Sequence, residues 1–504
     1  MGKASLTQML ANLDQFIQAI KDELGHPPDL IVRKTGKYVV LYLNGLVDQL
    51  RLEEEVLAPL ANTPEGAKPT IHAAQLRKTH EYTHVVHALV SGIVVVAWPG
   101  ASDVYLANLI APPHRSITEP AIESVIRGPR EGFTELMDVN IALVRRRLKT
   151  DKLRIRYWQV GKQSRTEVRL LYLDGIAKTE IVEEAARRIS AIEIDAVLES
   201  NYIEEMIRDQ PVSIFPTIQF TERPDVVVGS LLEGKVAILV DNSPMALIAP
   251  MQFWTAFQTS EDYYENYHYA TFIRIIRSIY VVIALIFPSL YVAITTFHQE
   301  MLPTNLLFSV AAAREATPFP ALVEAILMEI TFEALREAGL RLPRPVGQAV
   351  SIVGALVIGE AAVQAGIVSA PMVIVVSLTG IASFIIPRFN MSFAIRILRF
   401  PLILLAGSLG LFGIVFGLMA IVINMTGIRS LGEPYLAPLA PLRFSGLKDI
   451  ILRAPLWRMN TRPMPAKKEN RLRVPYDQLP QLEQPFDYYR LPIAGEQGNQ
   501  QGGA

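Results

Sequence analysis

The sequence of 504 residues contains no cysteine, which excludes disulfides, thiolate metal sites and cysteine nucleophiles. It also lacks any excess of charge, since 48 basic residues face 49 acidic ones, and no nucleic-acid motif is present. Nothing therefore favours a nucleic-acid partner. The first 20 residues lack the basic start, apolar run and small-residue cleavage site of a signal peptide. We expect the N-terminal half to be cytoplasmic.

Charged residues are rare in three stretches of the C-terminal half. Residues 278–297 and 400–428 have none, and residues 346–387 have only Glu360. At about 1.5 Å per helical residue, about 20 residues cross a hydrocarbon layer of roughly 30 Å. Gly366, Ser369 and Pro371 suit a tight turn inside the middle stretch. These runs predict membrane lipid around four spans, which are residues 278–297, 346–366, 371–387 and 400–428.

Residues 304–339 are apolar but interrupted by charges, so they could be re-entrant, interfacial or spanning. Pro318 and Pro320 should divide them into two helices. In the second piece Glu329, Glu333 and Glu337 recur every four residues and share one helix face. That face could lie wet at the membrane surface, or it could face a pore or a neighbouring subunit.

Basic residues near the spans predict the orientation. Arg274 and Arg277 precede the first span, and the tail of residues 429–504 is basic as far as Arg473. Both ends should therefore lie inside, which needs an even number of spans. Four spans leave three arginines outside the membrane. A fifth span would bring these arginines inside but would move the basic tail outside. We favour four spans. Those arginines are Arg388, Arg396 and Arg399.

The N-terminal half contains two similar passages. The run LYLNG at residues 41–45 matches LYLDG at 171–175, and residues 91–112 resemble 233–250 in the same order. Ordered matches between strand-like runs predict duplicated α/β subdomains. The expected fold is therefore a soluble α/β region with subdomains at 1–150 and 151–270. An α-helical multi-pass transmembrane bundle at 271–428 and a basic, partly disordered tail at 429–504 follow.

An enzyme-like motif lies in the first subdomain. Residues 80–84 read HEYTH, with His87 one turn later. On a helix His80 and His84 would face one metal, and Glu81 could act as a general base. However, no third ligand is evident, and Arg77 and Lys78 precede the motif where an active-site helix would be apolar. We expect the cluster to be structural, with no metal, no cofactor and no catalysis.

A helical wheel of residues 346–366 separates two faces. One face predicts a small-residue seam for helix packing, formed by Gln348, Ser351, Ala355, Gly359, Ala362 and Gly366. A second face, about 140° away, is a candidate pore lining formed by Val353, Val357, Glu360 and Gln364. A carboxylate facing lipid is costly. Glu360 is either a neutral or paired residue at a subunit contact, or part of a cation-attracting ring beside a hydrophobic constriction of Val353 and Val357.

Several runs resemble the A subunits of GerA-family spore germination receptors. They are FHQEMLPT at 297–304, REATPFPALVEA at 314–325, LRLPRPVGQAVSIVGALVIG at 340–359, FIIP at 384–387, RPD at 223–225 and EGKVAILVDNSP at 233–244. The resemblance implies a nutrient-receptor subunit in the inner membrane of the bacterial endospore. It also implies a ring-shaped homo-oligomer that forms an ion channel and acts with a transporter-like B subunit and a lipoprotein C subunit.

Three alternatives remain open. The A-like protein encoded with the dipicolinate channel genes is a close relative, although residues 314–325 look more like the receptor subunits. A secondary transporter would usually show two halves of matching hydrophobic topology, which four or five spans do not supply. A membrane-anchored metallopeptidase rests on the HEYTH motif alone.

Overall fold

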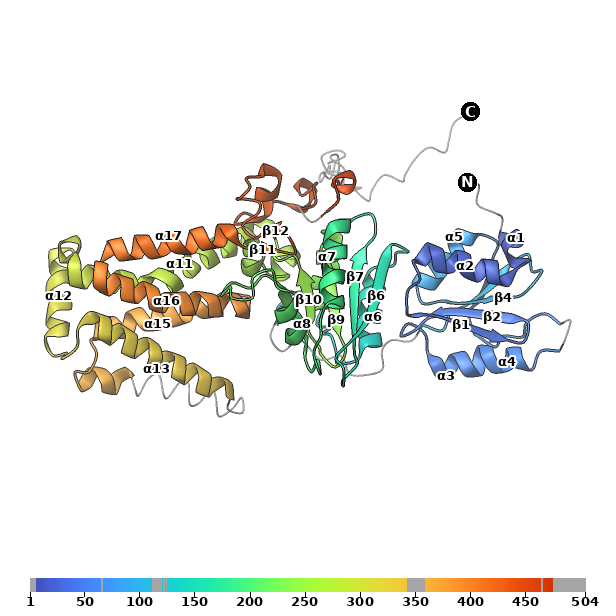
Figure 1. The fold of residues 1–504 in the computed structure, drawn as a ribbon, viewed down its shortest axis with the longest axis horizontal. Helices are drawn as coiled ribbons and strands as arrows, with labels where there is room; N and C mark the ends of the chain where they lie inside the picture. The colour runs from blue at the N-terminus through green and yellow to red at the C-terminus, as the bar shows by residue number, and fades with distance from the viewer. Residues whose placement is uncertain are drawn as a thin grey trace, which may run out of the picture.

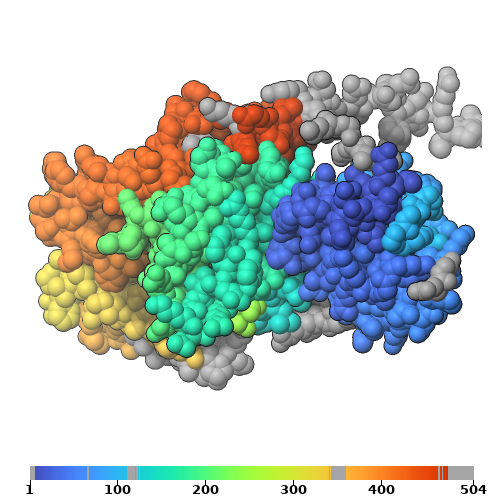
Figure 2. Space-filling view, turned by 45° about the vertical axis from the view of Figure 1, so that its right-hand side comes forward, coloured from blue at the N-terminus to red at the C-terminus, as the bar shows by residue number. Residues whose placement is uncertain are grey.

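The computed structural model describes residues 6–64, 67–110, 120, 123, 125–341, 359–463 and 466–474. Two α/β units come first along the long axis and a bundle of helices follows (Figure 1). The C-terminal segment turns back from the bundle and lies over the second unit, as Figure 2 also shows.

The first unit is an antiparallel sheet between two layers of helices. Its strand order is β1-β2-β4-β5-β3, with bounds β1 Leu30–Thr35, β2 Tyr38–Leu43, β3 Leu76–Thr79, β4 Val94–Ala97 and β5 Val104–Ala107. One face packs against α1 Leu6–Leu10, α2 Leu13–Leu24 and α5 Tyr82–Val90. The other packs against α3 Gln49–Leu52, the π-helical turn Glu53–Leu57 and α4 Ala58–Ala61. Because both faces are covered, every residue of β2 and β4 is buried.

The second unit repeats this topology. Its order is β6-β7-β9-β10-β8, with bounds β6 Leu153–Val160, β7 Thr166–Leu173, β8 Gln219–Thr221, β9 Val236–Val240 and β10 Ala246–Ala249. One face packs against α6 Met137–Arg147 and α9 Pro224–Leu232. The other packs against α7 Thr179–Ser190 and α8 Ser200–Ile207.

The matched sequence passages occupy equivalent places in the two sheets. The runs at 41–45 and 171–175 end β2 and β7, and Gly45 and Gly175 follow with φ of 78° and 77°. Glycine adopts this left-handed conformation without the strain that a Cβ brings. The equal strand order and equal turns are what a duplication predicts.

The boundary predicted at residue 150 needs correction. Helix α6 precedes that boundary, yet Ile141 and Val144 are buried in the core of the second sheet. The second unit therefore begins before Met137. The strand repeats located the two sheets, but they gave no sign of the helix that precedes the second one.

A buried ion pair joins the two units. The Arg145 guanidinium on α6 contacts the Asp29 carboxylate at 2.6 Å, and both side chains are buried. Nearby, the Asn44 amide donates to Asp138 at 2.9 Å.

The helices of the second half pack side by side, with α12 across the end distant from the α/β units (Figure 1). Their bounds are α11 Tyr267–Phe297, α12 Thr304–Glu315, α13 Ala321–Arg341, α15 Ala370–Phe384, α16 Phe389–Leu409 and α17 Leu411–Gly427. Among the described residues, α11 and α16 are long and apolar enough to cross a membrane, and α15 and α17 are shorter apolar helices.

The single span predicted over residues 400–428 is wrong. Helix α16 ends at Leu409, Gly410 turns the chain with φ 62° and ψ −140°, and α17 runs back along α16. This conformation is open essentially to glycine alone. The uncharged run hid the reversal because neither hydropathy nor charge changes there.

The remaining predicted spans can be compared with the helices of the structure. Residues 278–297 lie within α11 and residues 371–384 within α15. The expected break near Pro318 and Pro320 separates α12 from α13. Most of the predicted span 346–366 lies outside the described residues. The part that is described includes residues 359–364, which are helical.

The C-terminal segment packs on the second unit as far as residue 474. A bridge joins Ala466 to Ala177, and the Arg462 guanidinium donates to the carbonyl of Leu232 at 2.8 Å. The segment starts with a small hairpin of β11 Arg429–Ser430 and β12 Glu433–Pro434. The described part of the tail is therefore folded against the α/β region.

Candidate functional site

The acidic face of α13 points into the helical bundle. Glu329 and Arg399 form an ion pair at 2.6 Å, with side chains 0% and 1% exposed. Arg399 also donates from Nε to the carbonyl of Ala284 at 2.8 Å. One guanidinium therefore joins α11, α13 and α16.

The other glutamates of this face have different partners. Glu333, one turn further along α13, pairs with Arg396, one turn earlier on α16. Glu337 is exposed and pairs with Arg341 on its own helix. The face is therefore largely an intrachain contact, and only its last carboxylate is left at the surface.

Glu324, nearer the start of α13, is also buried. Its carboxylate accepts from the backbone N–H and the hydroxyl of Ser369, directly before α15. The Arg314 guanidinium at the end of α12 lies 3.9 Å away. Carboxylates at Glu324 and Glu329 thus fix α13 against its neighbours on successive turns.

Several buried polar atoms beside these pairs have no hydrogen-bond partner among the described residues. They are Oε2 of Glu324, Oε1 of Glu329, Nη2 of Arg399, Nη1 of Arg336 and the hydroxyls of Ser289 and Tyr291. Buried polar groups are normally satisfied by protein or water. A strip of unsatisfied polar atoms therefore lies along α13 inside the helical bundle.

The predicted pore-lining residues are only partly described. Val353 and Val357 lie outside the described residues. Glu360 and Gln364 are exposed, and the Gln364 amide donates to the Glu360 carboxylate at 3.1 Å.

The predicted packing seam is also partly described, since Gln348, Ser351 and Ala355 lie outside. Gly359 is buried, and a Cβ there would lie 3.7 Å from Val373 on α15. Ala362 is half-buried. Gly366 turns with φ 64°, and a Cβ there would lie 2.9 Å from the carbonyl oxygen of Ala316. These contacts place Gly359 and Gly366 against the chain's own helices.

A second charged cluster holds the start of α11. Arg274 and Arg277 contact the Asp262 carboxylate at 2.8 Å and 3.2 Å. Asp262 lies on α10 Glu261–Tyr264 and is buried. Burial opposes its charge, but the two arginines outweigh that effect and lower the pKa of Asp262.

The C-terminal segment reaches the same cluster. Asp449 accepts from Arg274 at 2.7 Å and from the Tyr263 hydroxyl at 2.7 Å. Burial raises the pKa of Asp449, although Arg274 and Tyr263 stabilise its charged form. Arg274 therefore connects the first helix of the bundle with α10 and with the tail.

A third link joins the α15–α16 turn to the α/β region. Arg388 pairs with Glu123, which also accepts from the Thr221 hydroxyl at the end of β8. Both charged side chains are largely buried.

The comparisons with known proteins decide the family. Residues 18–465 match the family described as Bacillus/Clostridium GerA spore germination protein. This chain belongs to the GerA family. It is 48% identical over 432 residues to an uncharacterized membrane protein, YfkQ, of Bacillus subtilis (strain 168), covering 84% of each chain. It is 43% identical over 488 residues to spore germination protein KA of the same organism, covering 93% of this chain and 89% of that one.

One solved structure is similar to half of this GerA-family chain. It is the N-terminal domain of the A subunit of the Bacillus megaterium spore germinant receptor GerK3, with 30% identity and a TM-score of 0.39. The match covers 50% of this chain and 99% of that one.

The HEYTH motif does not have the geometry that a zinc helix needs. Helix α5 begins at Tyr82 with Glu81 as its N-cap, so His80 precedes the helix and does not share a face with His84. His80, Glu81, His84 and His87 are all exposed. No group of three or more candidate metal ligands occurs among the residues described in this GerA-family chain.

The charge pattern predicts that Arg396 and Arg399 lie outside the membrane, whereas in the structure both pair with glutamates of α13. The available signal was their spacing. The two arginines are three residues apart and Glu329 and Glu333 are four apart, so each pair occupies one helix face. Opposite charges at matched spacing in two apolar segments indicate pairing, since isolated charges in such segments are costly.

Proposed function

We propose that this chain is the A subunit of a nutrient receptor that triggers spore germination. In this proposal copies of the chain assemble in the spore inner membrane as a ligand-gated ion channel, together with a transporter-like B subunit and a lipoprotein C subunit. Family membership supports the receptor role, and a receptor subunit needs no catalytic centre.

The strip of buried polar atoms in the bundle is the observation that best supports a channel. Glu324, Glu329 and Arg399 lie among apolar helices with atoms that no described residue satisfies. Water or a permeating ion would satisfy them, whereas lipid would not. Glu360 and Gln364 supply a polar surface outside this strip, which suits contact with water or a second copy.

The arrangement of the helices supports both chain ends on one side of the membrane, which we propose is the cytoplasmic side. Helix α11 leaves the α/β region and α17 returns to it (Figure 1). Because α16 and α17 form a hairpin, the α15–α16 turn with Arg388 also lies at this end. Arg388, which four spans would leave outside, is then compatible with an inside position, whereas Arg396 and Arg399 lie within α16 and pair with α13.

Conductance of the reconstituted protein tests the proposal. Val357→Ala should widen the constriction and cause leak without nutrient, and Glu360→Gln should lower cation conductance while assembly stays intact. Glu300→Gln is a matched control, because this exposed carboxylate lies beyond the end of α11. Unchanged conductance and selectivity in both variants would exclude the predicted span 346–366 from the pore. A purified complex holding one copy of the chain would contradict the oligomeric channel.

A further inference from the structure

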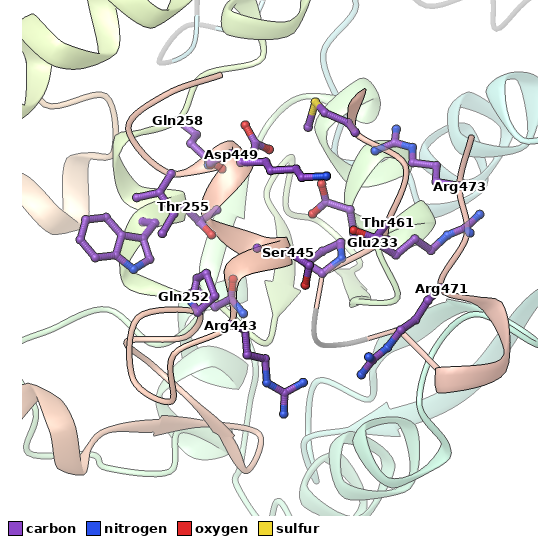
Figure 3. Close-up of a pocket in the computed structure, with 18 of the residues that line it drawn as sticks. Glu233, Gln252, Thr255, Gln258, Arg443, Ser445, Asp449, Thr461, Arg471 and Arg473 are labelled. Carbon is purple, nitrogen blue, oxygen red and sulfur yellow. The ribbon is translucent and has the colours of Figure 1, made fainter. Parts of the chain in front are cut away.

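A cavity of about 510 Å³ lies between the second α/β unit and the C-terminal segment. Residues 233–258 form one wall and residues 438–473 the other. Figure 3 shows Arg443, Arg471 and Arg473 on the C-terminal segment around this cavity. The volume falls within the range of about 300–1,000 Å³ that is common for small-molecule sites.

The lining is strongly basic. Two carboxylates face six cationic side chains, which are Lys235, Arg443, Lys448, Arg462, Arg471 and Arg473. Both carboxylates are already engaged. Glu233 pairs with Lys235 at 3.3 Å, and Asp449 binds Arg274 and Tyr263.

Most of these cations have no carboxylate partner. The side chains of Arg443, Arg471 and Arg473 are exposed and make no ion pair with any residue the structure describes. Arg462 donates only to neutral oxygens, those of Leu232, Asn470 and Leu472. Its pKa is lowered by burial and by the neighbouring charge of Arg473. Such like charges repel one another unless an anion lies between them.

One cation is held deep in the wall. Lys235 is 4% exposed, and Glu233 is the single ion-pair partner of its ammonium among described residues. A buried lysine is costly unless it is well paired. An anion in the cavity would give this ammonium a second partner beside Glu233.

We propose that this cavity binds a phosphate-bearing anion. Guanidinium forks match the tetrahedral oxygens of phosphate and can donate two hydrogen bonds each. Phosphate is favoured over a single carboxylate because four arginines and two lysines supply more donors than one carboxylate can accept. Trp254, Ile450 and Met459 give the cavity an apolar wall for the body of the ligand. The phosphate could come from a soluble metabolite or from a lipid headgroup.

The position of the cavity would couple the ligand to the bundle. Asp449 in its wall binds Arg274 at the start of α11. A neighbouring cavity of about 230 Å³ shares Lys235, Gln258 and Arg473 and extends to Arg388 at the α15–α16 turn. A bound anion would therefore stabilise the position of the C-terminal segment beside both contacts that join the α/β region to the helices. These contacts are Asp449 with Arg274 and Glu123 with Arg388. This inference does not depend on the channel proposal.

The test uses the full chain in nanodiscs of neutral phosphatidylcholine, with sodium pyrophosphate as the probe at constant ionic strength. We expect pyrophosphate to raise the melting temperature and to bind measurably by calorimetry. The double variant Arg443→Gln/Arg473→Gln should bind at least about tenfold more weakly, since two charge-assisted contacts are lost. Arg458→Gln is the matched control, an exposed arginine of the same segment outside the cavity lining.

A second arm distinguishes the two sources of phosphate. If a headgroup is the ligand, nanodiscs containing phosphatidylglycerol should stabilise the wild type and the control, and the double variant should lose that stabilisation. Three results would overturn the proposal: no stabilisation by pyrophosphate or anionic lipid, an equal effect in the double variant and the control, or citrate binding as tightly as pyrophosphate.

Discussion

Arg399 and Glu329 face each other at 2.6 Å across α16 and α13, and neither side chain is more than 1% exposed. Removing one member of such a pair leaves an uncompensated charge in the bundle. The pair therefore determines how α13 sits against α16 far more than an exposed pair could.

The first prediction concerns this pair. Glu329→Gln and Arg399→Gln should each destabilise the bundle by about 3–5 kcal/mol. The double variant should lose less stability than the two single variants together, because the two groups interact directly. Apparent melting temperatures in detergent provide the measurement. Glu337→Gln, at an exposed position of the same helix face, should change stability by no more than about 0.5 kcal/mol. Single variants as stable as this control would show that the pair does not hold the bundle.

The second prediction concerns the turn between α16 and α17. Gly410→Ala should destabilise the protein by about 1–3 kcal/mol, because the backbone conformation excludes a Cβ. A Cβ there would also lie 2.9 Å from Nε2 of His298. Gly427→Ala is the control, since a Cβ at that position meets nothing within 4 Å. Equal thermal stability of the two variants would argue against the hairpin.

The third prediction concerns pH. The pKa of Asp449 in the folded protein is raised above its ordinary value of 3.8. As pH rises, the unfolded chain therefore loses this proton at a lower pH than the folded protein does. The contribution of Asp449 to stability is therefore present at acid pH and declines as pH rises through the folded pKa. Asp262 has a lowered pKa, so its contribution is lost only as pH falls below 3.8.

Melting temperatures of the wild type and Asp449→Asn separate these effects. As pH rises above about 4, the wild type should lose stability relative to the variant, because only the wild type acquires the buried charge. A constant difference between the two proteins across this range would contradict the raised pKa.

The fourth prediction uses the absence of cysteine, which makes single introduced cysteines unambiguous labelling sites. Glu300→Cys, beyond the distal end of α11, and Arg458→Cys, in the C-terminal segment, are both exposed. A membrane-impermeant maleimide should reach them from opposite sides of the bilayer, and Arg458→Cys should label from the cytoplasmic side. Labelling of both from one side would refute the proposed topology.

Much of the α/β region could be predicted from the sequence. The repeated strand-turn runs were visible because buried strands and glycine turns leave short local patterns, and they fall in equivalent strands β2 and β7. The helix α6 left no repeat, so the boundary was placed too late. Local pattern located the sheets but not the element that joins them.

The helical part shows where local signals end. The break before α13 was predictable because proline acts on its own backbone, whereas the reversal at Gly410 depends on what α17 packs against. The pairing of Glu329 with Arg399 is a contact between residues 70 positions apart. Hydropathy counts each charge separately, so it assigns the arginines to the outside and leaves the glutamates open between a wet surface and a pore or subunit contact. Only the three-dimensional packing joins them.

The bundle is attached to the α/β region at two separate places, by Arg274 with Asp262 and Asp449 at the start of α11, and by Arg388 with Glu123 at the α15–α16 turn. A single covalent connection would act as a swivel and let the helices rotate independently. Attachment at two separate points, Arg274 and Arg388, removes that freedom, so a rotation of the second α/β unit exerts a torque on the helices.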